Sequence, residues 1–265
     1  MDDTIIRPVP DSSIITVGNE LLSGFTQDAN SSWLAARLFA RGYPVRRITI
    51  VGDVDSEIVT AVREDLARRE LARIFVCGGL GPTPDDRTYG ALALALERRL
   101  HYDRPTGALM QGLMFSRGVA ARRGTAELNA GNRRMATIPE GAAVLRNGPG
   151  MAPGLAFDLG GDRILFALPG PPHELQSIVE QLVLPRYLGG GTSPTVRELH
   201  YRLAPESAFH DVMRRLEAEY PDVSLGSYPQ AQLGRLTIRA TGIDADRVER
   251  AIEAVRAGVT AYQPG

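Results

Sequence analysis

Residues 72–86 read ARIFVCGGLGPTPDD, and this stretch decides the fold. Its first six residues are mostly apolar, which predicts a buried strand that ends at Cys77. The glycines that follow predict a turn, and a helix is predicted over residues 86–96. Glycines let a backbone approach a phosphate closely, and unpaired amides at a helix start can bind it. The stretch therefore predicts a phosphate-binding loop, with a plain turn as the alternative.

The sequence before this stretch repeats the alternation of strand and helix. Strands are predicted at residues 12–17 and 45–51, and helices at residues 28–41 and 55–70. This order predicts an α/β fold with three layers, doubly wound around a mostly parallel sheet. Ligands of such sheets bind outside the carboxyl ends of the strands. The turns predicted to meet there are residues 18–24, 52–55 and 78–86.

The rest of the chain predicts a continuation of this domain and a second, smaller one. Helices are predicted at residues 105–123 and 173–188, and a hairpin at residues 154–168 with its turn at Gly160 and Gly161. Three consecutive glycines at 189–191 predict a linker. After it, strand, helix, strand, strand and helix signals predict a small α+β (βαββα) domain. The expected boundaries are a tail at 1–11, the main domain at 12–188, the linker at 189–196 and the small domain at 197–265.

Composition excludes several mechanisms and partners. The 265 residues contain no lysine, which excludes a Schiff-base lysine and a P-loop lysine. The net charge is -1 and the basic runs are short, so no nucleic-acid partner is expected. No apolar window of roughly 18 residues predicts a membrane span, and the first residues do not read as a signal peptide. A cytoplasmic protein is expected, with its one cysteine, Cys77, buried in the core.

Four aspartates near the predicted strand ends point to a metal ion. Asp85 and Asp86 follow the glycines, and Asp53 and Asp55 lie in the neighbouring turn. Carboxylates repel a phosphate unless a cation lies between them, so a divalent ion such as Mg²⁺, Mn²⁺ or Co²⁺ is expected. Asp55 and Asp85 also suit helix caps. We accept that interpretation for Asp55 and leave both open for Asp85.

Seven short segments resemble the MoaB/Mog (molybdopterin-binding) superfamily in the same order along the chain. The most similar branch is that of competence/damage-inducible protein A, CinA. The segments are residues 18–24 (GNELLSG), 28–30 (DAN), 51–53 (VGD), 78–86 with Thr88, 132–136 (NRRMA), 152–154 (APG) and 168–172 (LPGPP). Leu80 stands where pterin-handling members usually have threonine, which favours the CinA branch.

The resemblance implies a metal-dependent nucleotide pyrophosphatase that cleaves ADP-ribose or a related dinucleotide. It places the catalytic role on Asp53 and Asp86, which would hold the metal together with Asp85. Arg87 or Arg134 could neutralise a second phosphate. The residues expected around the ligand are Gly18, Glu20, Asn30, Gly78, Gly79, Gly81, Thr83, Thr88, Asn132, Arg134, Pro169 and Gly170.

The same pocket could instead serve a protein of molybdenum cofactor biosynthesis that binds or adenylylates molybdopterin, which is the alternative function. In both cases the expected partner is a small phosphorylated molecule, a dinucleotide or a pterin. The resemblance also implies a homo-oligomer, either a dimer or a trimer.

Overall fold

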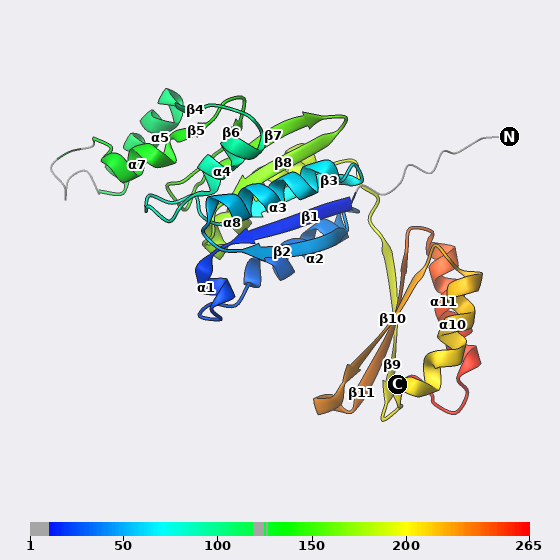
Figure 1. Cartoon of the computed structure of the whole chain (residues 1–265). Coiled ribbons are helices and arrows are strands. Elements are labelled where there is room, and N and C mark those ends of the chain that lie inside the picture. Colours follow the sequence, from blue (N-terminus) through cyan, green and yellow to red (C-terminus); the bar gives the residue numbers. More distant parts are fainter. Residues whose placement is uncertain (1–10, 119–124, 126) are drawn as a thin grey trace. The chain divides into compact units, whose positions relative to one another are not determined.

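The chain folds into two compact units, Met1–Gly191 and Thr192–Gly265 (Figure 1). The structure is a computed structural model that describes residues 11–118, 125 and 127–265. Each unit has a hydrophobic core of its own. The glycine run at residues 189–191 lies at the division between the two units.

The first unit is built on a six-stranded sheet. Its strands are β1 Asp11–Val17, β2 Val45–Val51, β3 Leu71–Cys77, β6 Ala143–Leu145, β7 Gly154–Gly160 and β8 Arg163–Leu168. The order across the sheet is β2-β1-β3-β8-β7-β6. The first four are parallel, whereas β7 is antiparallel to both of its neighbours. This confirms the mostly parallel sheet and the hairpin around Gly160 and Gly161.

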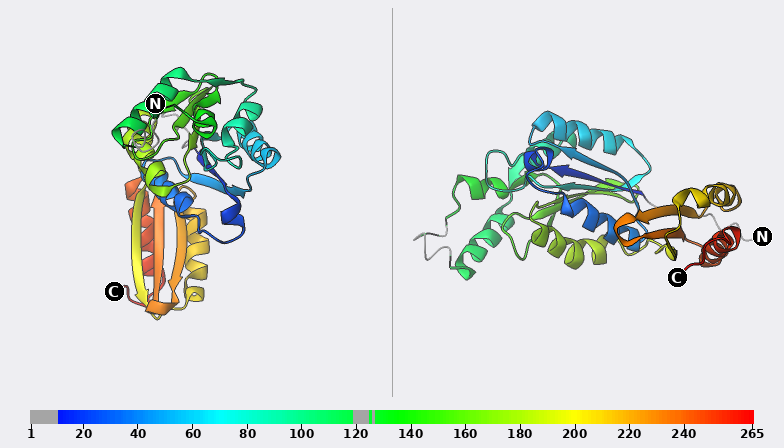
Figure 2. Two further views of the ribbon diagram at one scale, coloured as in Figure 1. Left: turned by 90° about the vertical axis from the view of Figure 1, so that its left-hand side faces the viewer. Right: turned by 90° about the horizontal axis from the view of Figure 1, so that it is seen from below.

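Helices cover both faces of this sheet and give three layers, which Figure 2 shows from two further sides. The helices are α1 Asn19–Leu22, α2 Ala29–Ala40, α3 Asp55–Ala67, α4 Thr88–Ala95, α5 Arg104–Ser116, α7 Ala130–Met135, α8 Pro172–Ile178 and α9 Leu184–Tyr187. One core lies under α3 and α4, and the other under α2 and α8. Strand β1 is buried along its whole length because Ile15 joins the first core and Ile14 the second. Burial on both faces explains why the central strand β3 is almost continuously apolar, whereas the edge strand β2 alternates between half-buried and exposed residues.

The predicted helix at 173–188 contains an irregular turn. A π-helical turn, Val179–Val183, separates α8 from α9. Pro185 follows it, and a proline has no amide to donate to the carbonyl four residues earlier. The wider turn accommodates that missing hydrogen bond.

Other differences concern short elements and helix starts. Helix α4 begins at Thr88, two residues later than predicted. The last residues of the predicted helix 105–123 lie outside the described part of the chain. Helices α1 and α7, strand β6, and the two-stranded sheet of β4 Leu100–Tyr102 and β5 Thr137–Pro139 were not predicted, since none is longer than six residues. Such elements are too short for a periodic pattern.

The second unit is a three-stranded antiparallel sheet with two helices. Its elements are β9 Thr195–Arg202, a 3₁₀ turn Glu206–Phe209, α10 His210–Glu219, β10 Ser224–Gln230, a 3₁₀ turn Ala231–Leu233, β11 Arg235–Gly242 and α11 Ala245–Gly258. The sheet order is β10-β11-β9. This confirms the βαββα pattern. In the part of the chain that the structure describes, every helix is too short or too polar to cross a bilayer.

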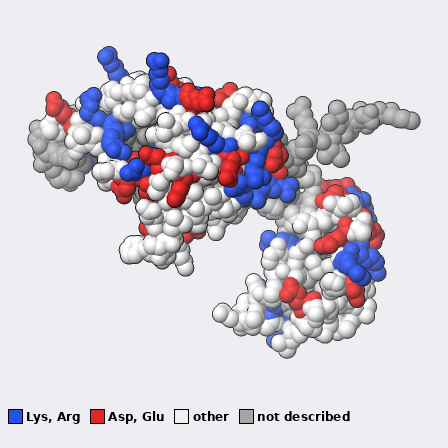
Figure 3. All heavy atoms as spheres, viewed as in Figure 1, with Lys and Arg blue, Asp and Glu red and all other residues white. Residues whose placement is uncertain are grey.

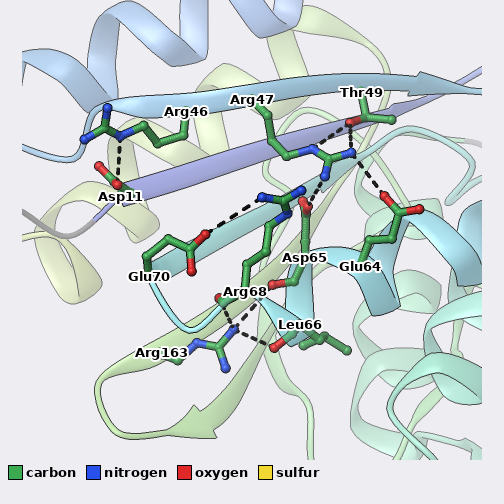
Figure 4. A network of polar contacts seen from close by, with 10 residues as sticks. All are labelled: Asp11, Arg46, Arg47, Thr49, Glu64, Asp65, Leu66, Arg68, Glu70 and Arg163. Carbon is green, nitrogen blue, oxygen red and sulfur yellow. Dashed lines mark hydrogen bonds and ion pairs between the residues drawn. The ribbon is translucent and has the colours of Figure 1, made fainter.

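Arginine side chains form hydrogen bonds and ion pairs near the amino ends of the strands of the first unit (Figure 4). Arg163 is buried, and its guanidinium donates to the carbonyls of Leu66 at 3.0 Å, Arg68 at 3.1 Å and Leu71 at 2.9 Å. These carbonyls lie where α3 ends and β3 begins, so Arg163 caps that connection. A cation at a helix carboxyl end also interacts favourably with the helix dipole.

A second part of this network surrounds Asp65, which is fully buried. Arg47 Nη1 lies 3.5 Å from Asp65 Oδ1, and Arg47 Nη2 lies 3.3 Å from Glu64 Oε2. Burial raises the pKa of Asp65 above its ordinary value, and the nearby Ser13 hydroxyl and Arg47 guanidinium offset this only in part.

Candidate functional site

A cavity of about 790 Å³ opens at the carboxyl ends of the parallel strands. Val17, the last residue of β1, lines this cavity, and the connections after β2, β3 and β8 all contribute further lining residues. The predicted turns at the strand ends therefore do meet. Of the predicted ligand residues, those that line this cavity are Gly18, Glu20, Gly78, Gly79, Gly81, Asn132, Pro169 and Gly170, together with Asp53, Asp85 and Asp86.

The glycine loop after β3 is shaped by positive backbone angles and by a buried threonine. Gly78 and Gly79 have φ values of 103° and 64°. A Cβ on Gly79 would lie 2.5 Å from Thr88 Oγ1, and one on Gly78 would collide with the carbonyl oxygen of Val17. Thr88 Oγ1 donates to the Gly78 carbonyl at 2.7 Å, and the Thr88 amide donates to the Gly79 carbonyl at 3.1 Å. Only glycine fits both positions.

Asp86 closes the second half of the loop. Its Oδ2 accepts hydrogen bonds from the Thr83 amide at 2.8 Å and from the Thr83 hydroxyl at 2.6 Å. A carboxylate has about four lone-pair sites, so Asp86 keeps acceptor capacity for a further group. Thr83, a predicted ligand residue, does not line the cavity; its hydrogen bonds to Asp86 stabilise the loop conformation.

Asp53 joins the turns after β1 and β2. Its Oδ2 accepts a hydrogen bond from the Asn19 amide at 2.8 Å, and its own amide donates to Asn19 Oδ1 at 3.3 Å. Sequence reasoning placed Asp53 in the cavity but missed its partner. Asn19 stands in the GNELLSG segment, which is the signal that could have identified it.

The helix-cap interpretation of Asp55 and Asp85 is wrong. The N-cap of α3 is Val54, and Asp55 is the first residue of that helix, 3.3 Å from Arg87 Nη1. The N-cap of α4 is Arg87, so Asp85 lies outside the cap position. Asp55 lies one position inside α3, and α4 starts later than its sequence pattern indicated, so neither aspartate takes a cap position. Asp85 lines the cavity instead.

Three other predicted residues lie behind or beside the cavity wall. Thr88 is buried beneath the glycine loop. Asn30 Nδ2 donates to the Gly170 carbonyl at 2.7 Å, so it supports the connection after β8. Arg134 donates to the Asp86 carbonyl at 2.9 Å and lines a second cavity of about 480 Å³, together with Arg87. This second cavity shares residues 79–81 and Asp86 with the first.

Sequence reasoning missed the wall formed by α8 and the connection between β6 and β7. Glu174 and Gly150 line the cavity there, and Arg117 at the end of α5 lines it as well. Asn147 Nδ2 donates to Glu174 Oε2 at 2.6 Å. Glu174 is two residues beyond the LPGPP segment, whereas Asn147 lies in no segment of the resemblance.

The charge of the cavity wall is predominantly negative. Glu20, Asp53, Asp85 and Asp86 all line it. Across the described ranges 11–118, 125 and 127–265, however, no three His, Cys, Asp or Glu side chains gather closely enough to hold a metal ion. A cation in this cavity would need oxygen ligands from a bound molecule or from water in addition to one or two carboxylates.

Fold and site together define a class: a three-layer α/β protein with a small-molecule cavity beside a glycine loop at the carboxyl edge of its sheet. The chain belongs to the family described as "Probable molybdopterin binding domain", whose model matches residues 13–189. A second family model, described as "FAD synthase, middle domain", matches residues 195–262.

Individual proteins agree with this assignment. A protein of Pyrobaculum calidifontis is 34% identical over 253 residues, which cover 93% of each chain. A protein of Thermococcus kodakarensis is 42% identical over 178 residues, which cover 66% of this chain and 69% of that protein. The crystal structure of CinA from Thermoplasma acidophilum, described as having unknown function, is 31% identical with a TM-score of 0.58 and covers 67% of this chain and 97% of its own. The chain is thus a CinA-like protein of the MoaB/Mog type.

Proposed function

We propose that this protein is a metal-dependent pyrophosphohydrolase that cleaves ADP-ribose or a related dinucleotide to AMP and a sugar phosphate. One observation carries the proposal: the glycine-loop backbone and the carboxylates of Asp53, Asp85 and Asp86 line the same cavity. Amides that bind phosphate oxygens beside carboxylates that attract a cation are the two elements that such a reaction requires.

The donor set of the cavity fits a hard divalent cation. Mg²⁺ prefers oxygen ligands and is often held by one or two carboxylates together with substrate phosphates. Asp53 and Asp86 would hold Mg²⁺, Mn²⁺ or Co²⁺, with Asp85 as a third acidic residue at the site. Such an ion would polarise a phosphate and lower the pKa of a bound water.

The residues of the chain itself would bind and orient the pyrophosphate. Backbone amides of residues 79–81 would donate to phosphate oxygens, since the Gly78 amide already donates to the Leu168 carbonyl at 2.9 Å. The hydrogen bonds of Thr88 and Asp86 hold that backbone in place before the ligand arrives. A preformed set of donors avoids the cost of ordering them during the reaction. Arg87 and Arg134 lie across the loop in the second cavity, where they would neutralise the more distant phosphate.

A substrate panel tests this proposal. The purified protein is incubated with ADP-ribose and Mg²⁺, Mn²⁺ or Co²⁺ in turn, and release of AMP and ribose 5-phosphate is followed. Asp86→Asn is expected to lose at least a hundredfold in turnover while it unfolds at the same temperature, because asparagine can still accept the Thr83 amide. Asp211→Asn, at an exposed position of the second unit, is the matched control and keeps full turnover. Background rates with every metal would refute the proposal.

The alternative function is the binding or adenylylation of molybdopterin, and the description of the matched family favours it. The same glycine loop would bind a pterin phosphate. Calorimetry with molybdopterin and ADP-ribose in parallel separates the two candidates. Micromolar binding of the pterin alone would replace the proposed function with this one.

We also propose that the protein self-associates as a dimer or a trimer. Several large apolar side chains are exposed: Ile48 at 47% and Ile50 at 40% on the edge strand β2, and Leu22 at 57% and Phe25 at 88% at the end of α1 and just after it. Exposed apolar side chains of this kind support association between copies. Sedimentation equilibrium measures the state directly, and a monomer at all concentrations would contradict the proposal.

A further inference from the structure

Glu174 is a carboxylate of the cavity wall that lies apart from the aspartates. It stands in the first turn of α8, which begins directly after the connection that leaves β8. The aspartates of the proposed metal site follow β2 and β3 instead. Because the strand order is β2-β1-β3-β8, the glycine loop lies between Asp53 and Glu174 along the sheet edge. Neighbouring strands are roughly 4.8 Å apart and three such steps separate β2 from β8, so Asp53 and Glu174 would contact different parts of a bound molecule.

The Glu174 carboxylate is held by a buried asparagine. Asn147 is 3% exposed and uses its whole amide group on the protein. Its Nδ2 donates to Glu174 Oε2 at 2.6 Å and to the Ala152 carbonyl at 2.8 Å, and its Oδ1 accepts the Gly150 amide at 2.8 Å. This wall is therefore fixed before any ligand binds, which lowers the entropic cost of binding.

Gly150 leaves the space that this contact occupies. A Cβ at this position would collide with both Glu174 Oε2 and Asn147 Nδ2. Any other residue would displace the carboxylate or break its hydrogen bond to Asn147. Asn147 and Gly150, both in the connection between β6 and β7, thus place the carboxylate of Glu174 from α8 in the cavity.

The chemistry of this wall favours hydrogen-bond donors and disfavours anions. A carboxylate with one hydrogen bond from Asn147 keeps further lone pairs, and these can only accept. Glu174 therefore repels a phosphate. Arg117 lines the same cavity, and its guanidinium donates to the Gly148 carbonyl at 2.7 Å. Arg117 thus adds one positive charge to a wall that is otherwise acidic.

We propose that Glu174 binds the vicinal hydroxyls of a ribose in the phosphorylated ligand whose phosphate lies at the glycine loop. Carboxylates commonly accept hydrogen bonds from ribose hydroxyls in nucleotide sites of α/β proteins. The inference rests on the proposed function for the place of the phosphate. It adds the residue that recognises the ribose, and with it a preference for a ribonucleotide or ribose phosphate over a deoxy compound or a pterin.

Binding measurements on the full-length protein test this assignment without any turnover. Calorimetry is carried out with AMP, ribose 5-phosphate and their 2-deoxy counterparts, 2′-deoxy-AMP and 2-deoxyribose 5-phosphate. The wild type is expected to bind at least one ribo compound about tenfold more tightly than its deoxy partner. Glu174→Gln is expected to lose that preference by weakening the ribo compound only, since glutamine still accepts the Asn147 amide and preserves the fold.

Two further variants make the result specific. Gly150→Ala, which displaces the Glu174 carboxylate without removing it, is expected to lose the same preference. Glu180→Gln is the matched control, because Glu180 lies on the following π-helical turn and pairs with Arg37 at 2.9 Å. It is expected to bind all four compounds as the wild type does.

The inference is overturned if Glu174→Gln keeps the wild-type preference, if it weakens ribo and deoxy compounds alike, or if the wild type binds none of the four. The outcome is separable from that of the proposed function. A protein that hydrolyses nothing but shows the Glu174-dependent preference would refute the hydrolase and support the ribose site. A protein that hydrolyses ADP-ribose without this preference would do the reverse.

Discussion

Thr88 controls the cavity from beneath the glycine loop, although it does not line the cavity itself. Its hydroxyl is buried and donates to the Gly78 carbonyl, and its amide donates to the Gly79 carbonyl. A loop that must present its amides to a ligand needs its carbonyls to be engaged elsewhere. Thr88 meets that need for two consecutive residues.

Thr88→Val is therefore expected to destabilise the protein by about 1–3 kcal/mol, because it leaves the Gly78 carbonyl buried without a donor. Urea unfolding monitored by circular dichroism measures the change. Thr88→Ser keeps the hydroxyl and is expected to retain most of the stability. Thr60→Val removes an exposed hydroxyl and serves as control. Equal losses for valine and serine would show that packing rather than the hydrogen bond is responsible.

Single residues of the site differ in how far sequence could place them. Asp53 and Asp86 were predictable because each follows a strand signal, and parallel strands end at one edge. Glu174 and Asn147 were not, because a contact between side chains 27 positions apart leaves no local pattern. Asp55 was assigned to a cap on residue type alone, and its ion pair with Arg87 depends on packing between α3 and α4.

Strands and long helices were predicted well because their signal is periodic. Strands β1, β2 and β3 each begin and end within one residue of their predicted positions, and α2 and α3 lie within their predicted ranges. The start of α4 was misplaced, since Pro84, Asp85 and Asp86 are typical of a first helical turn yet here belong to the loop. The hydrogen bonds between Thr83 and Asp86 stabilise the loop conformation more than the helix propensity of these residues favours a helix.

The end of α3 carries a group whose titration affects stability. Burial raises the pKa of Asp65 above 3.8, so the folded protein binds a proton more readily than the unfolded chain does. The contribution of Asp65 to the free energy of unfolding therefore falls as the pH rises from about 3.8 through the pKa of Asp65 in the folded protein. Above that pKa the contribution is constant.

Asp65→Asn removes this titration. Between pH 4 and pH 7 the wild type is expected to lose stability relative to the variant, and the difference is measured by urea unfolding at several pH values. Glu64→Gln changes the exposed partner of the same arginine and is expected to leave the slope unchanged. Parallel curves for the wild type and Asp65→Asn would contradict the role of burial.

At the scale of the whole molecule, the cavity lies entirely within the first unit. Every residue that lines the cavity belongs to Met1–Gly191. The two hydrophobic cores around the six-stranded sheet belong to the same unit. Arginine and acidic side chains are interspersed on the face seen in Figure 3.

A fragment of residues 1–191 is therefore expected to fold cooperatively. It is also expected to bind AMP with a dissociation constant within about threefold of that of the full chain, because it keeps every residue that lines the cavity. Thermal unfolding and calorimetry check both points. A fragment that aggregates or lacks a cooperative transition would mean that the first unit requires the second for stability.

Cys77 gives this protein a reporter of loop motion that needs no engineering. It is the one cysteine of the sequence, it ends β3 directly before Gly78, and it is 0% exposed. Its burial raises the pKa of its thiol, so a thiol reagent reacts only when the end of β3 opens. A ligand that fastens the glycine loop is expected to slow that reaction, and the labelling rate then measures occupancy of the cavity in the unmodified protein.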